Sequence, residues 1–301
     1  DYLAKMVEAI DAANPAVIAI DFDLRSPSPD GHPVEFPAYT DETKKFMDAV
    51  KAASHNRKIV LPKTVGYDDQ HNYVSESDIY NGFDFDNDNV RVGYIALPPD
   101  IRQVPWLSLH IKNGDPLNSF SQAIARADNE EAMQNLPEKT PLPYGSYIRP
   151  EAFTVVSSSE VLSRAPKVFE KLAHKIVILG GNWHSQGYKR GTQIDAYDTP
   201  IESVPGAYIH ANYVEALLDS RIYRPWAGWT LILIEVIQSL LIAIPFALKM
   251  PLLFKLLAVV VVCLALFAFS LLSLMVLGLF FDFFIPGILV LGHGIIEQIR
   301  E

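Results

Sequence analysis

Two aspartates near the start of the chain, Asp21 and Asp23, are well placed for chemistry. They close the segment VIAIDFD (17–23), in which an apolar run is followed directly by carboxylates. Such a run is typical of a strand that is buried on both faces of a parallel sheet. Ligands of open α/β sheets bind beyond the carboxyl ends of the strands, so both carboxylates are expected at a ligand-binding edge.

An apolar run followed by Asp-x-Asp resembles the first motif of phosphotransferases of the haloacid dehalogenase type. The resemblance implies a nucleophilic Asp21 and an acid/base Asp23, with Mg²⁺ between them. Members of that family have Thr or Val two residues after the second aspartate, where this chain has Arg25. In the alternative interpretation Asp21 and Asp23 cap loops or pair with Arg25, so phosphotransferase chemistry is a remote alternative.

A second segment of interest is the loop ILGGNWHSQGYKRGTQIDAYDTP (178–200). Its glycine pair follows a strand-like run and permits a tight turn or the close approach of a ligand to the backbone. The loop has neither the glycine pattern of a nucleotide-binding site nor a G-x-S-x-G nucleophile elbow. We interpret it as a surface loop that carries Asp195 and Asp198. The histidines of the chain lack metal-ligand spacing, and no metal or other cofactor is predicted.

A third polar pair, Glu235 and Gln238, lies within an apolar segment and shares one helix face, because the residues are three apart. An ionisable group in a membrane is costly and usually faces the interior of a helix bundle. We expect a hydrogen-bonded contact between helices, with Ser270, Ser273 or His293 as candidate partners. A contact that transmits a signal is the alternative.

Three nearly charge-free runs surround these residues, at about 226–248, 256–277 and 279–297. A helix of about 20 apolar residues spans the hydrocarbon core of a bilayer. The sequence therefore predicts one domain at 1–225 and a bundle of three transmembrane helices at 226–301, with the start of a cytoplasmic connector at its end.

The orientation follows from the basic residues. Lys249 and Lys255 lie between the first two runs, and basic loops stay in the cytoplasm. Three crossings then place residues 1–225 outside, periplasmic or extracellular, and the C-terminus in the cytoplasm. Export of the first domain requires a signal or anchor helix before Asp1, and we expect this chain to be a fragment. The alternative keeps the domain in the cytoplasm.

The first 225 residues read as an α/β domain with a largely parallel sheet flanked by helices. Hydrophobic periodicity predicts helices at 1–14, 41–53, 119–127, 159–172 and 207–218, and strands at 17–23, 58–65, 90–97, 153–158 and 175–181. The whole chain has a formal charge of −10. An acidic domain argues against nucleic acid as a partner, since that role needs a basic surface.

Four stretches together resemble the CHASE2 domain, an extracytoplasmic sensory module of bacterial receptors that three membrane helices usually follow. The first is PAVIAIDFDL with its preceding helix, and the second is GFDFDNDNVRVGYIAL, in which Asp86, Asp88 and Arg91 fall on the family's positions. The third is KIVILGG. The fourth runs from Ile194 to Pro225 and carries Asp195, Thr199-Pro200, Pro205-Gly206 and His210-Ala211-Asn212. The chain departs from the family in having Gln193-Ile194 where Gly-Leu is common.

The resemblance implies a sensor in the inner membrane of a bacterium, a receptor that works as a dimer or with other membrane subunits. Its ligand, a small molecule or a protein, is unidentified. The candidate ligand-binding residues lie at the strand ends and the start of the last helix: Asp21, Asp23, Arg91, Asp195, Thr199, His210 and Asn212. For His210 and Asn212 a structural role is the alternative.

The region itself is not expected to be an enzyme, although such receptors usually continue into a cyclase or kinase domain. The alternative function is a membrane-anchored periplasmic scaffold or subunit of a larger assembly.

Overall fold

The chain forms two compact units, Asp1–Arg221 and Ile222–Glu301, in a computed structural model. Each unit is described by itself. The structure describes residues 2–24, 41–76, 78–85, 88–97, 103–104, 108–112, 114–131, 142–143, 148–181, 196–198, 203–219, 224–225, 228–248, 251–277, 279–280, 292 and 296.

The first unit is built on a four-stranded parallel sheet of β1 (Val17–Asp21), β2 (Lys58–Lys63), β5 (Val90–Tyr94) and β10 (Ile176–Gly180). The strand order is β10-β1-β2-β5. The chain therefore adds strands to one side of β1 and then crosses back to place β10 on its other side. This arrangement confirms the expected α/β class with a parallel sheet, and it creates a topological switch point between β1 and β10.

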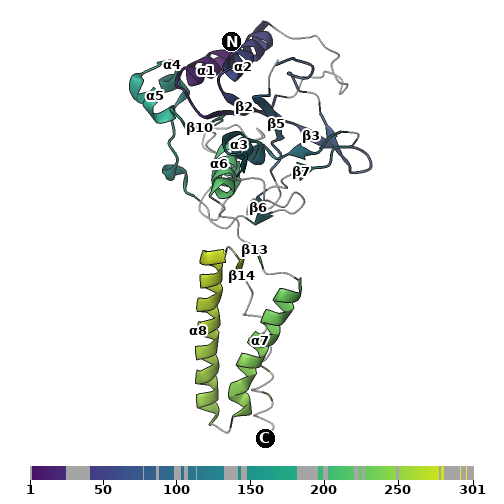
Figure 1. The fold of residues 1–301 in the computed structure, drawn as a ribbon, viewed down its shortest axis with the longest axis vertical. Coiled ribbons are helices and arrows are strands. Elements are labelled where there is room, and N and C mark those ends of the chain that lie inside the picture. Colours follow the sequence, from purple (N-terminus) through teal and green to yellow (C-terminus); the bar gives the residue numbers. More distant parts are fainter. Residues whose placement is uncertain are drawn as a thin grey trace, which may run out of the picture. The chain divides into compact units, whose positions relative to one another are not determined.

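Helices cover both faces of this sheet (Figure 1). One face packs against α1 (Tyr2–Ala12), α2 (Asp41–Ser54), α4 (Ser158–Leu162) and α5 (Pro166–Leu172). Successive side chains of a strand point to opposite faces. In β1, Ile18 and Ile20 accordingly enter this core, together with Met6 and Ile10 of α1 and Met47 of α2.

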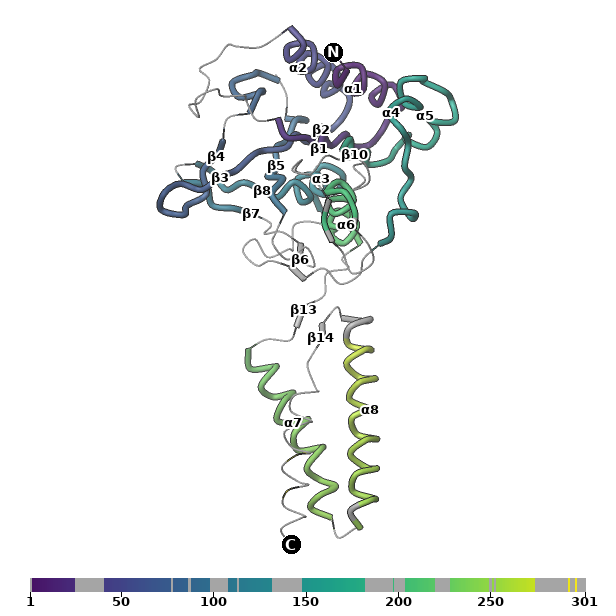
Figure 2. The backbone as a smooth tube through the Cα atoms, turned by 180° about the vertical axis from the view of Figure 1, so that it is seen from behind, coloured from purple at the N-terminus to yellow at the C-terminus, as the bar shows by residue number. Residues whose placement is uncertain are grey.

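The other face packs against α3 (Phe120–Asp128) and α6 (Gly206–Leu218), as the tube in Figure 2 shows. Val17 and Ala19 of β1 meet Phe120 and Ile124 of α3 and Val214 of α6 in this second core. Helix α3 begins where Ser119 caps it, because the Ser119 side chain accepts a hydrogen bond from the Gln122 amide. Asp21 follows Val17 and Ala19 at alternate positions, so it belongs to the α3/α6 face.

Short two-stranded sheets also belong to the first unit. They are antiparallel and pair β3 (Val65–Tyr67) with β4 (Tyr73–Ser75), β6 (Gln103–Val104) with β9 (Leu142–Pro143), β7 (Ser108–Leu109) with β8 (Leu117–Asn118), and β11 (Ala196–Asp198) with β12 (Ser203–Pro205).

Two expectations for the segment 153–172 are wrong. Residues 153–158 form no strand, because a short 3-10 helix (Pro150–Ala152) precedes them and Ser157 caps α4. The expected single helix at 159–172 is two helices, α4 and α5. Arg164 has a φ of 52° and Pro166 opens α5, so the chain turns between the two helices.

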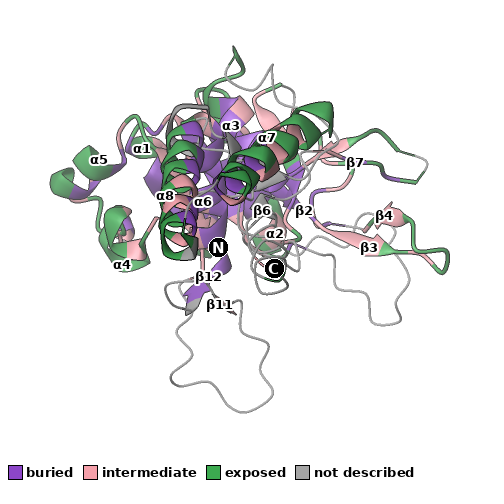
Figure 3. Cartoon of the chain, turned by 90° about the horizontal axis from the view of Figure 1, so that it is seen from below, coloured by how far each residue is buried: buried purple, intermediate pink, exposed green. Residues whose placement is uncertain are grey.

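The second unit contains α7 (Gly228–Ala247) and α8 (Leu252–Leu277). Both are long and apolar enough to cross a membrane, with a mean hydropathy of 2.1 and 2.9, and exposed residues cover most of their surface (Figure 3). They pack through Ile242, Val259 and Leu266. Two such helices occur among the described residues, where three were expected. The third expected span, 279–297, falls almost wholly outside the described residues.

The ends of this helix pair are held by two contacts. The short strand β13 (Arg224–Pro225), which precedes α7, pairs in parallel with β14 (Leu279–Phe280), which follows α8. At the opposite end, buried Lys255 donates a hydrogen bond to the Phe246 carbonyl in the last turn of α7. A cation is favourable at a helix C-terminus, since the carbonyl ends of the peptide dipoles gather there.

Candidate functional site

The carboxyl ends of β1 and β10 meet at the topological switch point of the sheet. Asp21, the last residue of β1, lies opposite Gly180, the last residue of β10. Strand-end crevices at such points are the usual ligand sites of open α/β sheets. The structure therefore brings together an aspartate and a glycine that the sequence singled out separately.

Gly180 allows the first turn of α6 to lie directly against these strand ends. A Cβ atom on Gly180 would lie 2.7 Å from the Ala207 Cβ and 3.3 Å from the Asp21 Oδ2. Only a residue without a side chain fits at this separation, so the close approach is made by α6 itself. The Asp21 carboxylate consequently lies beside the N-terminal turn of α6, where peptide dipoles favour a negative charge.

His210, one turn farther along α6, connects this helix with β1 and α3. Its Nε2 lies 3.9 Å from the Asp21 Oδ1, and its Nδ1 lies 3.2 Å from the Ser121 Oγ. The Phe120 ring meets the imidazole edge-on at a centroid distance of 5.1 Å. We call Asp21, Ser121, Gly180 and His210 the strand-end cluster.

The strand-end cluster has the residue types of a serine nucleophile with its base and acid, but its geometry is different. Ser121 is fully buried, and His210 is 2% exposed. The 3.9 Å between His210 and Asp21 is longer than a hydrogen bond. A nucleophile has to reach its substrate, and an enclosed hydroxyl does not. The contacts of His210 instead hold α6 against α3 and the end of β1.

Asn212 is buried on α6 and holds a neighbouring segment by its amide. Its Oδ1 accepts a hydrogen bond from the Ile148 amide at 2.7 Å, and its Nδ2 donates to the carbonyls of Ile148 at 3.2 Å and Tyr208 at 2.9 Å. These bonds tie the segment before α4 to α6 in the manner of a paired strand. They are the contacts of a structural residue, and a ligand role for Asn212 stays a prediction.

The structure does not bring Arg91 to the strand-end cluster. Arg91 lies near the amino end of β5, opposite Val60, and its guanidinium pairs with Glu130 at 2.7 Å. Asp23 is exposed just beyond β1. The remaining two candidates, Asp195 and Thr199, lie outside the described residues. Among the described residues, no three side chains of His, Cys, Asp or Glu gather in a way that could hold a metal ion.

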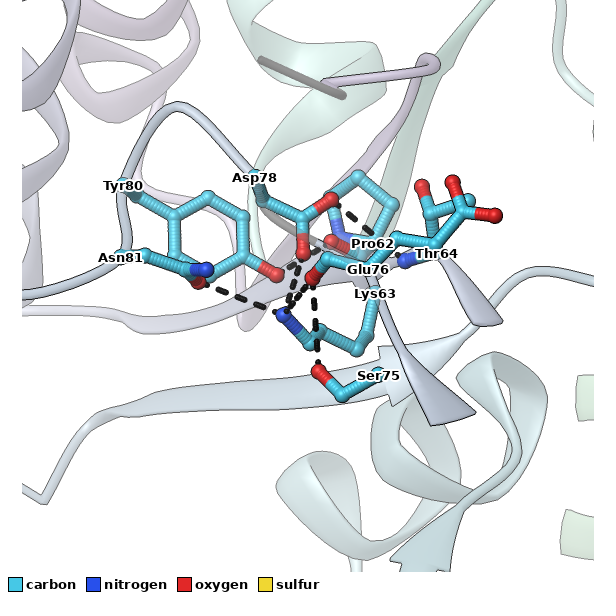
Figure 4. A network of polar contacts seen from close by, with 8 residues as sticks. All are labelled: Pro62, Lys63, Thr64, Ser75, Glu76, Asp78, Tyr80 and Asn81. Atoms are coloured by element: carbon cyan, nitrogen blue, oxygen red, sulfur yellow. Dashed lines mark hydrogen bonds and ion pairs between the residues drawn. The ribbon is translucent and has the colours of Figure 1, made fainter. Parts of the chain in front are cut away.

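A second buried polar group, which the sequence did not indicate, closes the carboxyl end of β2 (Figure 4). The Lys63 ammonium donates to the Asp78 Oδ2 at 2.6 Å, the Glu76 carbonyl at 2.8 Å and the Asn81 Oδ1 at 3.2 Å. It also lies 5.9 Å from the centre of the Tyr80 ring. An ammonium has three hydrogens, so these three acceptors satisfy it.

The electrostatics of this group agree with a structural role. Asp78 is fully buried, and burial raises the pKa of its carboxyl, which Lys63 opposes by its hydrogen bond and charge. Burial also raises the pKa of Tyr80, whose hydroxyl donates to the Pro62 carbonyl. The group therefore fixes residues 76–81 across the end of β2. No local spacing marks these residues, since Lys63 and Asp78 are joined only through an intervening hairpin.

The two residues of the expected polar pair in the second unit are buried to different extents. Glu235 is partly buried in α7, whereas Gln238 is 1% exposed. Among the described residues, neither the Oε1 nor the Nε2 of Gln238 has a hydrogen-bond partner. The buried serines of α8, Ser270 and Ser273, are therefore not its partners. The third candidate partner, His293, lies outside the described residues.

Comparison with known proteins identifies one family. The model of the CHASE2 domain matches residues 1–248, a range that contains the whole α/β unit and all of α7. No curated protein and no solved structure matches the chain. The family match confirms the resemblance drawn from the four sequence stretches.

Proposed function

The chain belongs to the CHASE2 family of extracellular sensory domains, and we propose that it is the extracytoplasmic sensing part of a bacterial transmembrane signalling receptor. The observation that carries the proposal is the extent of the family match. It does not stop at the α/β unit but continues through α7, so the sensory unit and an apolar helix occur together.

The input site of the proposed receptor is the edge of the sheet at which α6 begins. Helix α6 contacts the ends of β1 and β10 through Ala207 and His210 and ends at Leu218, ten residues before α7 starts at Gly228. A ligand that binds this edge more tightly in one position of α6 would shift the equilibrium between two positions of the helix. The ligand is a small molecule or a protein, and the receptor works as a homodimer or with other membrane subunits.

We propose an inner-membrane topology with three crossings. The pairing of β14 with β13 returns the chain, after α8, to the end at which α7 begins. A third span at 279–297 would therefore run in the same direction as α7 and end on the side of the α7–α8 turn. The basic Lys249 and Lys255 favour the cytoplasm for that turn. Residues 1–225 then face the periplasm and the C-terminus faces the cytoplasm.

Cysteine labelling of intact cells tests this topology. Cys263 is first replaced by Ala, and a single cysteine is then introduced at one of two positions. These are Tyr67, which is 65% exposed in the hairpin of β3 and β4, and Leu248, which is 49% exposed just after α7. A membrane-impermeant maleimide should label Tyr67→Cys in intact cells and Leu248→Cys only after permeabilisation. The reverse pattern would establish the cytoplasmic alternative.

A scaffold or assembly subunit without its own output is the second candidate. The burial of His210 and Asn212 favours it, because both side chains hold α6 in place. The intact mass of the native polypeptide distinguishes the two functions. A cyclase or kinase domain after residue 301 would support the receptor, and a chain without an output domain would support the scaffold.

A further inference from the structure

Glu235 is the only charged residue of α7, a helix that is apolar enough to cross a membrane. It lies about 10 Å along the axis from the start of the helix at Gly228, since the rise is about 1.5 Å per residue. Glu235 is partly buried, and no hydrogen bond or ion pair joins it to another of the described residues. The core of a bilayer has no water to pair with a carboxyl group, and such groups are usually paired with protein. Glu235 therefore requires a polar partner.

Small residues continue the side of α7 on which Glu235 lies. Ser239, Ala243 and Ala247 follow it at intervals of four, and residues four apart are neighbours on the surface of a helix. Ser239 is partly buried, whereas Ala243 and Ala247 are exposed. We call Glu235, Ser239, Ala243 and Ala247 the α7 stripe. It extends for about 18 Å along the axis, which is more than half of the hydrocarbon core of about 30 Å.

The α7 stripe differs from the side by which α7 packs within its own chain. The buried residues of the helix are Gln238, Ile242 and Pro245, and Ile242 packs against Val259 and Leu266 of α8. The exposed alanines of the stripe lie outside this packed side. The stripe thus offers a surface of small side chains with a carboxyl group and a hydroxyl group at one end.

Small residues allow two transmembrane helices to approach closely, and polar side chains at such contacts form hydrogen bonds between the helices. We propose that the α7 stripe is the surface by which two copies of this chain associate in the membrane. Two copies that insert in the same direction are related by a two-fold axis along the bilayer normal. Each residue then lies at the same depth as its counterpart, so the surface has to be complementary to itself.

The polar end of the stripe meets this requirement. A serine hydroxyl can donate a hydrogen bond to a carboxyl oxygen, so Glu235 and Ser239 together supply both an acceptor and a donor to the same pair on the other copy. No printed contact within the described part of the chain uses the Ser239 hydroxyl. A subunit of different sequence would need a polar group of its own at the same depth, whereas a second copy supplies it by symmetry.

Disulfide crosslinking of the full chain in membranes tests the surface. Cys263 is replaced by Ala, and a single cysteine is placed at Ala243 or, as the matched control, at Leu241. Both positions are exposed and lie at nearly the same depth. They lie on opposite sides of the helix, since two residues turn it by about 200°. Oxidation should join two copies through Ala243→Cys and leave Leu241→Cys unjoined. Equal joining at both positions, or none at Ala243→Cys, overturns the proposal.

Energy transfer between labelled copies of the full chain in liposomes tests the role of Glu235. Glu235→Leu should weaken association by about tenfold, because one hydrogen bond between membrane helices contributes about threefold and the two-fold axis repeats the contact. Glu235→Gln keeps an acceptor and should associate nearly as the wild type does. A Glu235→Leu variant that associates as tightly as the wild type overturns the proposal. If that variant also melts at a lower temperature, Glu235 pairs within its own chain instead.

The small side chains of the stripe are tested in the same assay. Ala243→Ile should weaken association at least as much as Glu235→Leu, because the larger side chain keeps the two helices apart. The matched control is Ala265→Ile, which makes the same change at an exposed position of α8 and should leave association unchanged. An equal loss in both variants would mean that bulk anywhere on the helix pair disturbs association, and would reject the stripe.

This inference rests on the proposed function and deepens it by naming the partner and the surface that binds it, and the two can fail separately. Maleimide labelling of Tyr67→Cys reports which side of the membrane the domain faces and does not depend on α7. A domain that faces the cytoplasm while two copies join through Ala243→Cys keeps the stripe and loses the extracytoplasmic receptor. A domain that faces outside while Leu241→Cys joins as readily as Ala243→Cys keeps the receptor and loses the stripe.

Discussion

Replacing Lys63 by methionine should be the most destabilising single change in the polar group at the end of β2. Lys63→Met keeps most of the side-chain volume and removes the ammonium. Asp78, which is fully buried, would then lose its charged partner and keep the hydrogen bond from the Thr64 amide at 3.4 Å. The Glu76 carbonyl and the Asn81 amide would each lose the donor that Lys63 supplies.

The magnitude follows from the burial of the pair, whose side chains are 11% and 0% exposed. Removing one partner of a buried ion pair costs about 3–5 kcal/mol, because the remaining charge is left without compensation. A domain of this size loses about 2–4 °C of melting temperature per kcal/mol, so a decrease of about 6–20 °C is expected. The double variant Lys63→Met/Asp78→Asn removes the orphaned charge and should recover about half of the loss.

Thermal melting of the full chain in detergent, followed by near-ultraviolet circular dichroism, measures this effect. The matched control is Lys112→Met, which breaks the exposed pair with Asp68 and should leave the melting temperature almost unchanged. Burial raises the pKa of Asp78 above its ordinary value of 3.8, and the loss of Lys63 raises it further. The folded Lys63→Met variant then holds a proton more tightly than its unfolded chain, so its stability falls as the pH rises through this window. The melting temperature of Lys63→Met should therefore lie closer to that of the wild type at pH 5 than at pH 7.5.

Two results would refute this reasoning. A decrease of the melting temperature no larger than that of Lys112→Met would mean that Lys63 does not compensate a buried charge. A loss that is as large in Lys63→Met/Asp78→Asn as in the single variant would mean that Asp78 is not the group left unpaired.

Three further changes test other parts of the structure. Asn212→Ala removes three hydrogen bonds to backbone groups, including two to Ile148. It should lower the free energy of unfolding by about 2–4 kcal/mol in chemical denaturation, and an unchanged free energy would count against the structural role. Gln238→Leu should stabilise the α7–α8 pair by about 1–3 kcal/mol, because its buried amide has no partner among the described residues. A destabilised pair in detergent melting would instead show that the amide is bonded in the membrane. Hydrogen bonds from Ser157 lower the pKa of Glu160, so Ser157→Ala should raise it. An unchanged titration of the Glu160 carboxyl carbon by NMR would exclude the capping box.

The sequence alone determined most of the local elements. Helices α1, α2, α3 and α6 and the four sheet strands lie within a few residues of their expected ranges, because a hydrophobic period of 3.6 or 2 is a local property. The two described apolar helices follow from their composition in the same way. The strand predicted at 153–158 does not form, and this shows the limit of the method. An apolar run forms a strand only where a neighbouring strand pairs with it.

The candidate site depended on the order of the strands. Asp21 and Gly180 were each marked by sequence, but they meet only because β10 crosses back to pair with β1. Arg91, which the sequence grouped with them, lies toward the amino end of β5, since register decides how far along a strand each residue lies. No sequence period connects Ser121 with His210, which are 89 residues apart, or Lys63 with Asp78.

Which polar groups share a buried site was therefore decided by tertiary structure. A strand or helix follows from interactions between residues a few positions apart, and these interactions leave a periodic trace in the sequence. A buried polar cluster follows from sheet order, register and the packing of distant helices, which bring together residues with no fixed spacing. Each buried polar group needs a hydrogen-bond or ion-pair partner, but this need does not determine which residue of the sequence that partner is.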